Sequence, residues 1–389
     1  MPFKWIVVLF IIIPFYFSGC LTKAENTLRL GSEKVEVWLP MLEGKKVGLL
    51  INHTSLIGTE HLLDSMLSLG IDVKYIFVPE HGFRGTQDAG QNIEDGYDNI
   101  SGLPIISLYG ASKKPHKEQM QDLDVVVFDI QDVGIRFYTY ISSMHYMMEA
   151  CAEYSVPMLI LDRPNPNGNY VDGPVLKDGF SSFVGMHPIP IVHGLTVGEL
   201  ANMINHRGWL KDGVKCDLTV ITMDNYNHNM EYVLPVKPSP NLPNYLSVRL
   251  YPSLCFFEGT EISVGRGTQF PFQVIGYPNC GFGDFSFIPK AGLGATQPLQ
   301  ENKVCYGLDL RNQNASELKF TLGYLLKFYK LWGSTDDFFS KESFFNLLAG
   351  NDSLIVKIKE GWSEDEIRES WQDDLNNYLR IREQYLLYP

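Results

Sequence analysis

Short apolar runs recur through the first part of the chain, and longer segments with helical spacing separate them. The apolar runs cover residues 47–51, 73–78, 105–108, 125–130, 158–161, 189–192 and 218–221. Because these runs are apolar at consecutive rather than alternating positions, they are typical of strands that are buried on both faces. We therefore expect a central sheet that is covered on both sides.

Between these runs, residues 60–69, 138–154 and 196–209 predict helices. In the second segment, Ile141, Met144, Met148 and Ala152 recur three or four residues apart, which places them on one face of a helix. Strands that alternate with helices favour an α/β fold built on a doubly wound parallel sheet.

The alternation stops near residue 236. There the chain enters a proline-rich stretch, residues 235–243, which predicts a hinge. Helical periodicity returns only over residues 316–329 and 363–388. A chain of 389 residues also exceeds the usual size of one domain. We therefore predict a doubly wound domain over residues 28–236 and a smaller α+β domain over residues 237–389, with a cleft between them.

Residues 1–20 differ from the rest of the chain. A basic residue precedes an apolar run over residues 5–17, and Ser18 and Gly19 then lead to Cys20. This pattern predicts an export signal, and small residues before a cysteine are typical of a bacterial lipoprotein cleavage site. We expect an exported protein of the periplasm or cell envelope that is anchored to the membrane through lipid on Cys20. Simple cleavage of the leader and an uncleaved anchor are the alternatives.

The composition narrows the possible partners. Hydrophobic residues make up 45% and charged residues 20% of the chain, as in ordinary globular proteins. The formal net charge of −13 would repel phosphate backbones, so we expect no nucleic-acid partner. No CxxC motif occurs, and we expect mainly buried thiols, with one disulfide as the alternative, at Cys151, Cys216, Cys255, Cys280 and Cys305.

Polar residues follow nearly every predicted strand, and the carboxyl ends of parallel strands share one edge of the sheet, where such folds bind ligands. One cleft is therefore predicted to receive side chains from five strand ends, and the candidates are Asn52, His53, Glu80, His81, Arg84, Asp129, Asp132, Arg136, Tyr138, Asp162, Arg163, Asn165 and His193.

Some of these positions have a simpler explanation. Asn52, Gly82, Gly134 and Asn167 are residue types that turns and helix caps use routinely. A turn, however, has no need for Glu80, His81 and Arg84 together, and the aromatic residues nearby suggest a sugar ligand.

In the second domain, Glu258 and Arg266 are the candidates for ligand binding. Arg266 lies between Gly265 and Gly267, where a flexible backbone would present a fixed cation to a ligand.

The sequence lacks the motifs of several common nucleotide-binding and hydrolytic sites. The pairs Gly281–Gly283 and Gly292–Gly294 lack the third glycine of a dinucleotide-binding fingerprint, and no P-loop, GxSxG or HExxH pattern occurs. His53, His81, His193 and Asp129 match no standard metal-binding spacing. We therefore expect neither a metal nor a cofactor.

Several ordered blocks of sequence carry a family resemblance that extends from about residue 45 to residue 389. They are residues 79–85 (PEHGFRG), 128–134 (FDIQDVG), 136–140 (RFYTY), 161–166 (LDRPNP), 238–241 (PSPN), 257–260 (FEGT), 265–268 (GRGT) and the ending 385–388 (YLLY). Together they resemble the exo-acting β-N-acetylmuramidases, a family long catalogued only as a domain of unknown function.

The resemblance implies a Rossmann-like first domain without a nucleotide and an active site in the cleft between the two domains. It also implies release of N-acetylmuramic acid from the non-reducing end of peptidoglycan-derived disaccharides and glycan chains, without a cofactor. Two alternatives remain: another exo-hexosaminidase, or a non-catalytic lipoprotein that binds cell-wall glycan fragments.

Glycosidic cleavage needs a protonated acid at the leaving oxygen and a second group that supports the oxocarbenium-like centre. We predict Glu80 as the acid, and Asp129 or Asp132 as base, nucleophile or orienter of the acetamido group of the sugar. The lactyl carboxylate of muramic acid calls for a cation, and the candidates are Arg84, Arg163 and Arg266.

The leader generates a prediction of its own. We expect the mature chain to begin at a lipidated Cys20, because the leader ends in small residues before this cysteine. Mass spectrometry of the membrane fraction should find an amino-terminal peptide that carries lipid. An unmodified peptide that spans Gly19 and Cys20 in the mature protein would contradict the prediction.

Overall fold

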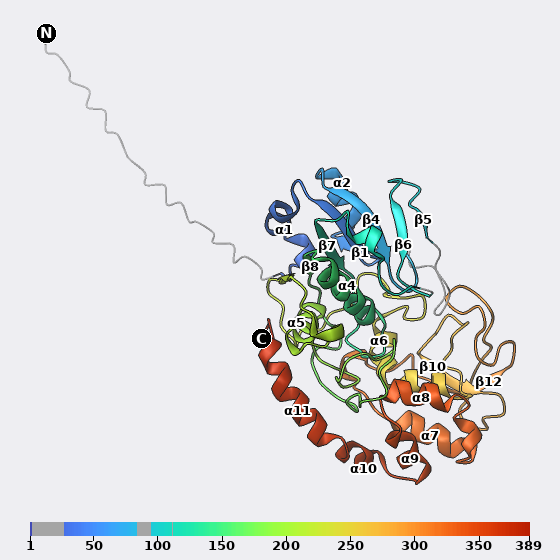
Figure 1. Cartoon of the computed structure of the whole chain (residues 1–389). Coiled ribbons are helices and arrows are strands. Elements are labelled where there is room, and N and C mark those ends of the chain that lie inside the picture. The colour runs from blue at the N-terminus through green and yellow to red at the C-terminus, as the bar shows by residue number, and fades with distance from the viewer. Residues whose placement is uncertain (2–26, 84–94, 111) are drawn as a thin grey trace.

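The computed structural model describes residue 1 and residues 27–83, 95–110 and 112–389. The predicted doubly wound sheet is confirmed (Figure 1). Seven strands lie in the order β5-β6-β4-β1-β7-β8-β9, and all of the pairings are parallel except that of β5 with β6. Their bounds are β1 (Lys46–Ile51), β4 (Asp72–Val78), β5 (Gly96–Tyr97), β6 (Pro104–Ser107), β7 (Val125–Asp129), β8 (Met158–Leu161) and β9 (Leu218–Ile221).

Helices cover both faces of this sheet, as consecutive apolar positions require. Leu49 of β1 belongs to one apolar cluster, together with residues of α1 (Val35–Leu42) and α2 (Leu62–Ser68). The next residue, Leu50, belongs to the cluster on the other face, with α4 (Tyr140–Tyr154) and α5 (Val197–Arg207). Both leucines are fully buried, so neither face of β1 is open to solvent.

One predicted strand is wrong. Residues 189–192 lie in the long connection between β8 and α5 and form only isolated bridges, in which Val192 pairs with Ile135 and Asp172. The run is nevertheless buried. An apolar run indicates burial, and here irregular loops rather than neighbouring strands provide the burial. The helix that follows begins where its sequence predicts, because Thr196 caps its first turn by accepting a hydrogen bond from the Glu199 N–H.

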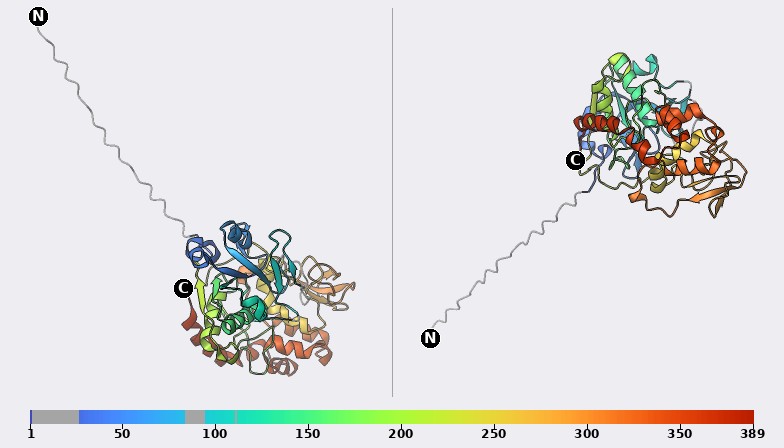
Figure 2. Two further views of the ribbon diagram at one scale, coloured as in Figure 1. Left: turned by 45° about the horizontal axis from the view of Figure 1, so that its top comes forward. Right: turned by 90° about the horizontal axis from the view of Figure 1, so that it is seen from below.

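A smaller second domain contains an antiparallel sheet and a set of helices. Its strands lie in the order β10-β12-β11. The elements are α6 (Tyr245–Leu254), β10 (Val274–Tyr277), β11 (Phe285–Phe287), β12 (Cys305–Asp309), α7 (Gly323–Trp332), α8 (Glu342–Ala349), α9 (Ser353–Lys359), α10 (Glu364–Glu369) and α11 (Gln372–Arg382). Figure 2 shows this domain, in yellow to red, packed against the first. One apolar cluster runs through both domains and joins Phe137 to Tyr251 and Phe256.

Short elements complete the described part of the chain. They are β2 (Leu56–Ile57), β3 (Glu60–His61), α3 (Lys117–Met120), and the 3₁₀ helices η1 (Gly31–Glu33), η2 (Lys211–Gly213), η3 (Cys255–Gly259), η4 (Ala315–Glu317), η5 (Asp336–Phe338) and η6 (Glu383–Tyr385). Within residues 27–83, 95–110 and 112–389, no helix has the length and apolar character needed to cross a membrane. The five cysteines in these ranges are buried thiols, as predicted.

The C-terminal segment returns from the second domain to the first and runs beside α5 (Figure 1). The Tyr378 hydroxyl donates to the His193 carbonyl at 2.7 Å, and the Arg382 guanidinium donates to the Gly194 carbonyl. At its end, the Tyr388 hydroxyl donates to Asp162 Oδ2 at 2.6 Å and accepts from the Met223 N–H. The chain end therefore closes over the first domain.

This arrangement corrects the prediction that Asp162 faces a ligand. Asp162 is fully buried and also accepts hydrogen bonds from the Thr196 hydroxyl and the Gly198 N–H. Burial raises its pKa to about 6. Its carboxyl group holds the start of α5 and the C-terminal Tyr388 in place.

We expect Tyr388→Phe to lower the free energy of unfolding by about 1–3 kcal/mol, because the substitution removes a donor from a buried carboxyl group. Urea denaturation at neutral pH measures the change. Tyr385→Phe is the matched control, since the Tyr385 hydroxyl makes no hydrogen bond within the described ranges and its ring packs on His206. Equal stability of the two variants would contradict the assigned role of Tyr388.

Candidate active site

A cavity of about 740 Å³ lies where the carboxyl edge of the large sheet meets the second domain. The first domain contributes the segments after β4, β6 and β7, together with residues 183–184. The second domain contributes the segments around residues 239–242, 257–266 and 294–299. This cavity, called the cleft below, therefore lies at the edge where doubly wound sheets bind their ligands.

Glu80 follows β4 and lines the cleft, as predicted. The Thr139 hydroxyl, which also lines the cleft, donates a hydrogen bond to Glu80 Oε2 at 2.6 Å. The next two residues, His81 and Gly82, have φ angles of 71° and 70°. A non-glycine residue in this left-handed region is strained, and such strain concentrates at functional sites. The backbone turn thus places Glu80 and His81 in the cleft.

Aromatic rings make up much of the cleft wall. They are Tyr109, Phe137, Tyr138, Phe183, Tyr251, Phe257, Phe272 and Phe344. A concave, mainly apolar wall with a few convergent polar groups is typical of a small-molecule site. Flat aromatic faces also suit the apolar faces of a sugar ring.

Glu258 and Arg266 both line the cleft, and they form an ion pair with one another. Arg266 Nε donates to Glu258 Oε1 at 2.6 Å, and the guanidinium carbon lies 5.3 Å from the centre of the Phe272 ring. The flanking glycines are required: a Cβ at Gly265 would lie 2.5 Å from Val274 Cγ2, and one at Gly267 would lie 2.5 Å from the Lys290 carbonyl oxygen. The predicted cation is therefore present, but a carboxylate already neutralises it.

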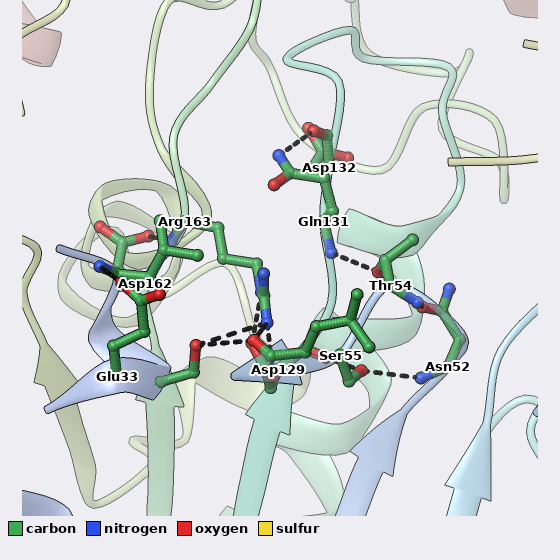
Figure 3. Close-up of polar contacts among 12 residues, drawn as sticks. Glu33, Asn52, Thr54, Ser55, Asp129, Gln131, Asp132, Asp162 and Arg163 are labelled. Atoms are coloured by element: carbon green, nitrogen blue, oxygen red, sulfur yellow. Dashed lines mark hydrogen bonds and ion pairs between the residues drawn. The ribbon is translucent and has the colours of Figure 1, made fainter. Parts of the chain in front are cut away.

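Asp129 and Arg163 are not in the cleft, contrary to prediction. Asp129 is fully buried at the end of β7, and Arg163 Nη2 donates to Asp129 Oδ2 at 2.7 Å (Figure 3). Arg163 also donates to the Leu56 carbonyl, and the Ser55 hydroxyl donates to the Asp129 carbonyl. Each charged group has its partner inside the protein, because an unpaired charge at this depth would be very costly. The pair ties together the ends of neighbouring strands.

Asp132 does not line the cleft either. It is buried, its Oδ2 accepts from the Gly134 N–H at 2.6 Å, and burial raises its pKa to about 7. His193 Nε2 lies 4.0 Å from the same oxygen, and burial lowers the pKa of His193 to about 3. The carboxyl group and the imidazole are both buried, and neither residue lines the cleft.

Three further predicted residues have partners in the backbone. Arg136 is fully buried and donates to the carbonyls of Pro174, Ile189 and, from the second domain, Leu348. Asn165 and Asn52 each bind the backbone of their own turns, as the simpler explanation of such residues anticipates. Contrary to prediction, none of the three residues lines the cleft, because burial and hydrogen bonds to the backbone hold them inside the protein.

His53 and Tyr138 hold the proline-rich segment against the first domain. His53 Nε2 lies 2.8 Å from the Lys237 carbonyl oxygen, and the Tyr138 hydroxyl donates to the Pro238 carbonyl at 2.9 Å. Tyr138 also lines the cleft, so it joins the two domains and shapes the site. Two other predicted residues, Arg84 and Cys20, lie outside the described residues.

Several residues that line the cleft were not predicted from the sequence, among them Thr139, Phe183, Lys113 and Lys341. Thr139 lies within a family block, and Lys113 follows the third strand end by a few residues, so position alone gave a signal for both. Phe183 and Lys341 lie far from any strand end. Within the described ranges, no group of three or more His, Cys, Asp or Glu residues is arranged to hold a metal ion.

Known proteins share this fold. Two solved structures of DUF1343 family proteins from Bacteroides fragilis NCTC 9343 are similar. One is 45% identical, covers 93% of this chain and 99% of its own, and has a TM-score of 0.86. The other is 28% identical, covers 94% of this chain and 100% of its own, and has a TM-score of 0.81.

The sequence also matches a curated protein and two family models. The peptidoglycan β-N-acetylmuramidase NamZ of Bacillus subtilis (strain 168) is 37% identical over 381 residues, which cover 89% of this chain and 88% of that protein. The models for the N-terminal and C-terminal parts of exo-β-N-acetylmuramidase NamZ match residues 47–246 and 249–388. The chain therefore belongs to the exo-β-N-acetylmuramidase NamZ family of glycoside hydrolases.

Proposed function

We propose that this protein removes N-acetylmuramic acid from the non-reducing ends of peptidoglycan fragments, with Glu80 as the general acid. The observation that carries the proposal is the position of the Glu80 carboxyl group in an aromatic cleft, where the Thr139 hydroxyl orients it at 2.6 Å. Membership of the family and the curated relative that acts on peptidoglycan support this substrate.

Glu80 and Glu258 both line the cleft, one from the first domain and one from the second. Glu80 accepts a hydrogen bond from a neutral hydroxyl group, whereas Glu258 is paired with the Arg266 cation. Glycosidic cleavage needs an acid at the leaving oxygen and a second group at the ring carbon, and the cleft offers these two carboxyl groups for the two tasks.

In the proposed reaction, Glu80 gives its proton to the glycosidic oxygen as the bond to the anomeric carbon breaks. The electron pair of that bond stays on the leaving sugar, and the ring carbon takes on positive charge. The Glu258 carboxylate lines the same cleft and would support this charge or orient the acetamido group of the sugar. Water then adds to the anomeric carbon, and its proton restores Glu80.

We also propose that the protein acts in the cell envelope, attached through Cys20. The leader supports export, and the path of the first described residues is compatible with a tether. Arg29 forms a bridge with Asp224, just beyond β9, which is the edge strand opposite β5. The cleft is lined instead by segments that follow β4, β6 and β7. A tether at the β9 edge would leave the cleft open to glycan fragments.

The activity and the role of Glu80 are tested together. We expect the purified protein to hydrolyse a chromogenic β-N-acetylmuramide far faster than the matching glucosaminide. Glu80→Gln should fold but lose roughly 10²- to 10⁴-fold in turnover of the natural disaccharide, because a general acid contributes about that much. On the chromogenic substrate, whose leaving group departs without protonation, the loss should be smaller.

Glu258→Gln is the contrasting variant. If Glu258 supports the charge on the ring, the substitution should lower the turnover of both substrates to a similar extent. Thermal melting of all variants controls for folding. Near-normal turnover of the disaccharide by Glu80→Gln would refute the acid role, and the absence of any muramidase activity in the wild type would refute the proposed function.

A further inference from the structure

The cleft contains three cationic side chains among the described residues: Lys113, Arg266 and Lys341. Arg266 is neutralised by Glu258, so it carries little free charge toward a ligand. A second arginine that the sequence suggested, Arg163, is paired with Asp129 in the protein interior. Among the described residues that line the cleft, Lys113 and Lys341 are therefore the cations left to pair with a ligand anion.

Lys113 lies in the segment that links β6 to α3, at the carboxyl edge of the large sheet. Its Nζ lies 4.4 Å from the centre of the Phe183 ring, which also lines the cleft. Phe183 is held in turn between Tyr109 and Tyr146, at centroid distances of 5.7 and 6.3 Å. An aromatic face attracts the ammonium group without neutralising it. The cation is thus both positioned and available.

Lys114, the next residue in the sequence, is paired with carboxylates and serves as a comparison for Lys113. Lys114 Nζ lies 2.6 Å from Glu153 Oε1 and 3.4 Å from Glu149 Oε2, both on α4. Lys113 makes no ion pair with a carboxylate of the described residues. The two consecutive lysines therefore differ: Lys114 is paired with α4, whereas Lys113 lines the cleft and has no carboxylate partner among the described residues.

Lys341 is a weaker candidate for holding an anion. Its side chain is exposed at the start of α8, and no described aromatic ring or carboxylate holds it in one position. Fixing such a chain on a ligand costs more conformational entropy than using Lys113, which is partly buried and already placed over a ring.

We propose that Lys113 is the specificity-determining residue of the cleft and binds the lactyl carboxylate of N-acetylmuramic acid. The inference rests on the proposed function and extends it to the group that distinguishes muramic acid from glucosamine. The lactyl ether is the only anionic substituent that separates the two sugars. In a protein with a formal net charge of −13, an unpaired cation in the cleft also offsets the repulsion of an anionic substrate.

The test is a double comparison of enzyme and substrate. Wild type and Lys113→Met are assayed on a chromogenic β-N-acetylmuramide and on the same compound with its lactyl carboxylate converted to a neutral methylamide. For the wild type we expect kcat/KM to fall about 10- to 100-fold on the amide, as for loss of a charge-assisted hydrogen bond. Lys113→Met should lose a similar factor on the carboxylate, mainly through KM, and little more on the amide.

Two variants serve as controls. Lys113→Arg keeps the charge and should recover most of the preference for the carboxylate substrate. Lys114→Met removes a lysine that lies next in the sequence but is paired outside the cleft, so its ratio between the two substrates should equal that of the wild type. Thermal melting establishes that each variant folds.

The outcomes separate this inference from the proposed function. If Lys113→Met discriminates between carboxylate and amide as well as the wild type does, the inference is wrong, and the same holds if Lys341→Met alone abolishes the discrimination. If the wild type hydrolyses neither compound, the proposed function itself fails. Equal losses by Lys113→Met on both substrates would mean that Lys113 acts on the fold rather than on the lactyl group, which would also overturn the inference.

Discussion

The buried pair of Asp129 and Arg163 is the interaction on which the ligand-binding edge of the sheet depends. Asp129 ends the central strand β7, and Arg163 follows the neighbouring strand β8. The same guanidinium donates to the carbonyl of Leu56, in the segment that follows β1. Figure 3 shows Arg163 and Asp129 among the neighbouring polar residues. Three adjacent strand ends are thereby joined. Removing one partner of such a pair costs about 3–5 kcal/mol, because it leaves an uncompensated buried charge.

The cleft arises because the second domain is fastened to this edge at several independent points. Arg136 bridges carbonyls of both domains, and Tyr138 holds the proline-rich segment at Pro238. The C-terminal segment adds a third attachment through Tyr388 and Asp162. The apolar cluster that runs through both domains has no break at the linker. A cleft wall that is attached at several points suits a site that must hold a sugar ring in one orientation.

Most of the charged residues near the cleft form ion pairs with one another or hydrogen bonds with other groups of the protein. The Glu258–Arg266 pair lies in the cleft itself, whereas the carboxyl group of Asp162 and the guanidinium of Arg136 are consumed by hydrogen bonds in the interior. Among the described residues, the charged side chains that line the cleft are Glu80, Glu258, Arg266, Lys113 and Lys341. The proposed acid and the proposed lysine ligand in an aromatic cavity match a sugar that has one bond to break and one carboxylate to distinguish it.

The hydrophobic periodicity of the chain predicted the fold class and six strands of the sheet, because a strand that is buried on both faces has consecutive apolar residues. It also predicted the ligand-binding edge, because the carboxyl ends of parallel strands lie on one side of the sheet. The residue types after β4 predicted that Glu80 faces the cleft, because no turn requires a glutamate, a histidine and an arginine together, and Glu80 does line the cleft. The same reasoning placed Asp129, Arg136, Asp162 and Arg163 in the cleft, whereas the structure buries them outside its lining. A charged residue after a strand has the same local pattern whether it faces a ligand or a buried partner. The partners here are distant in sequence, such as Tyr388 for Asp162 and Leu348 for Arg136. Only the tertiary structure shows which charged side chains already have a partner inside the protein. It therefore separates the residues that stabilise the site from those that can contact a substrate.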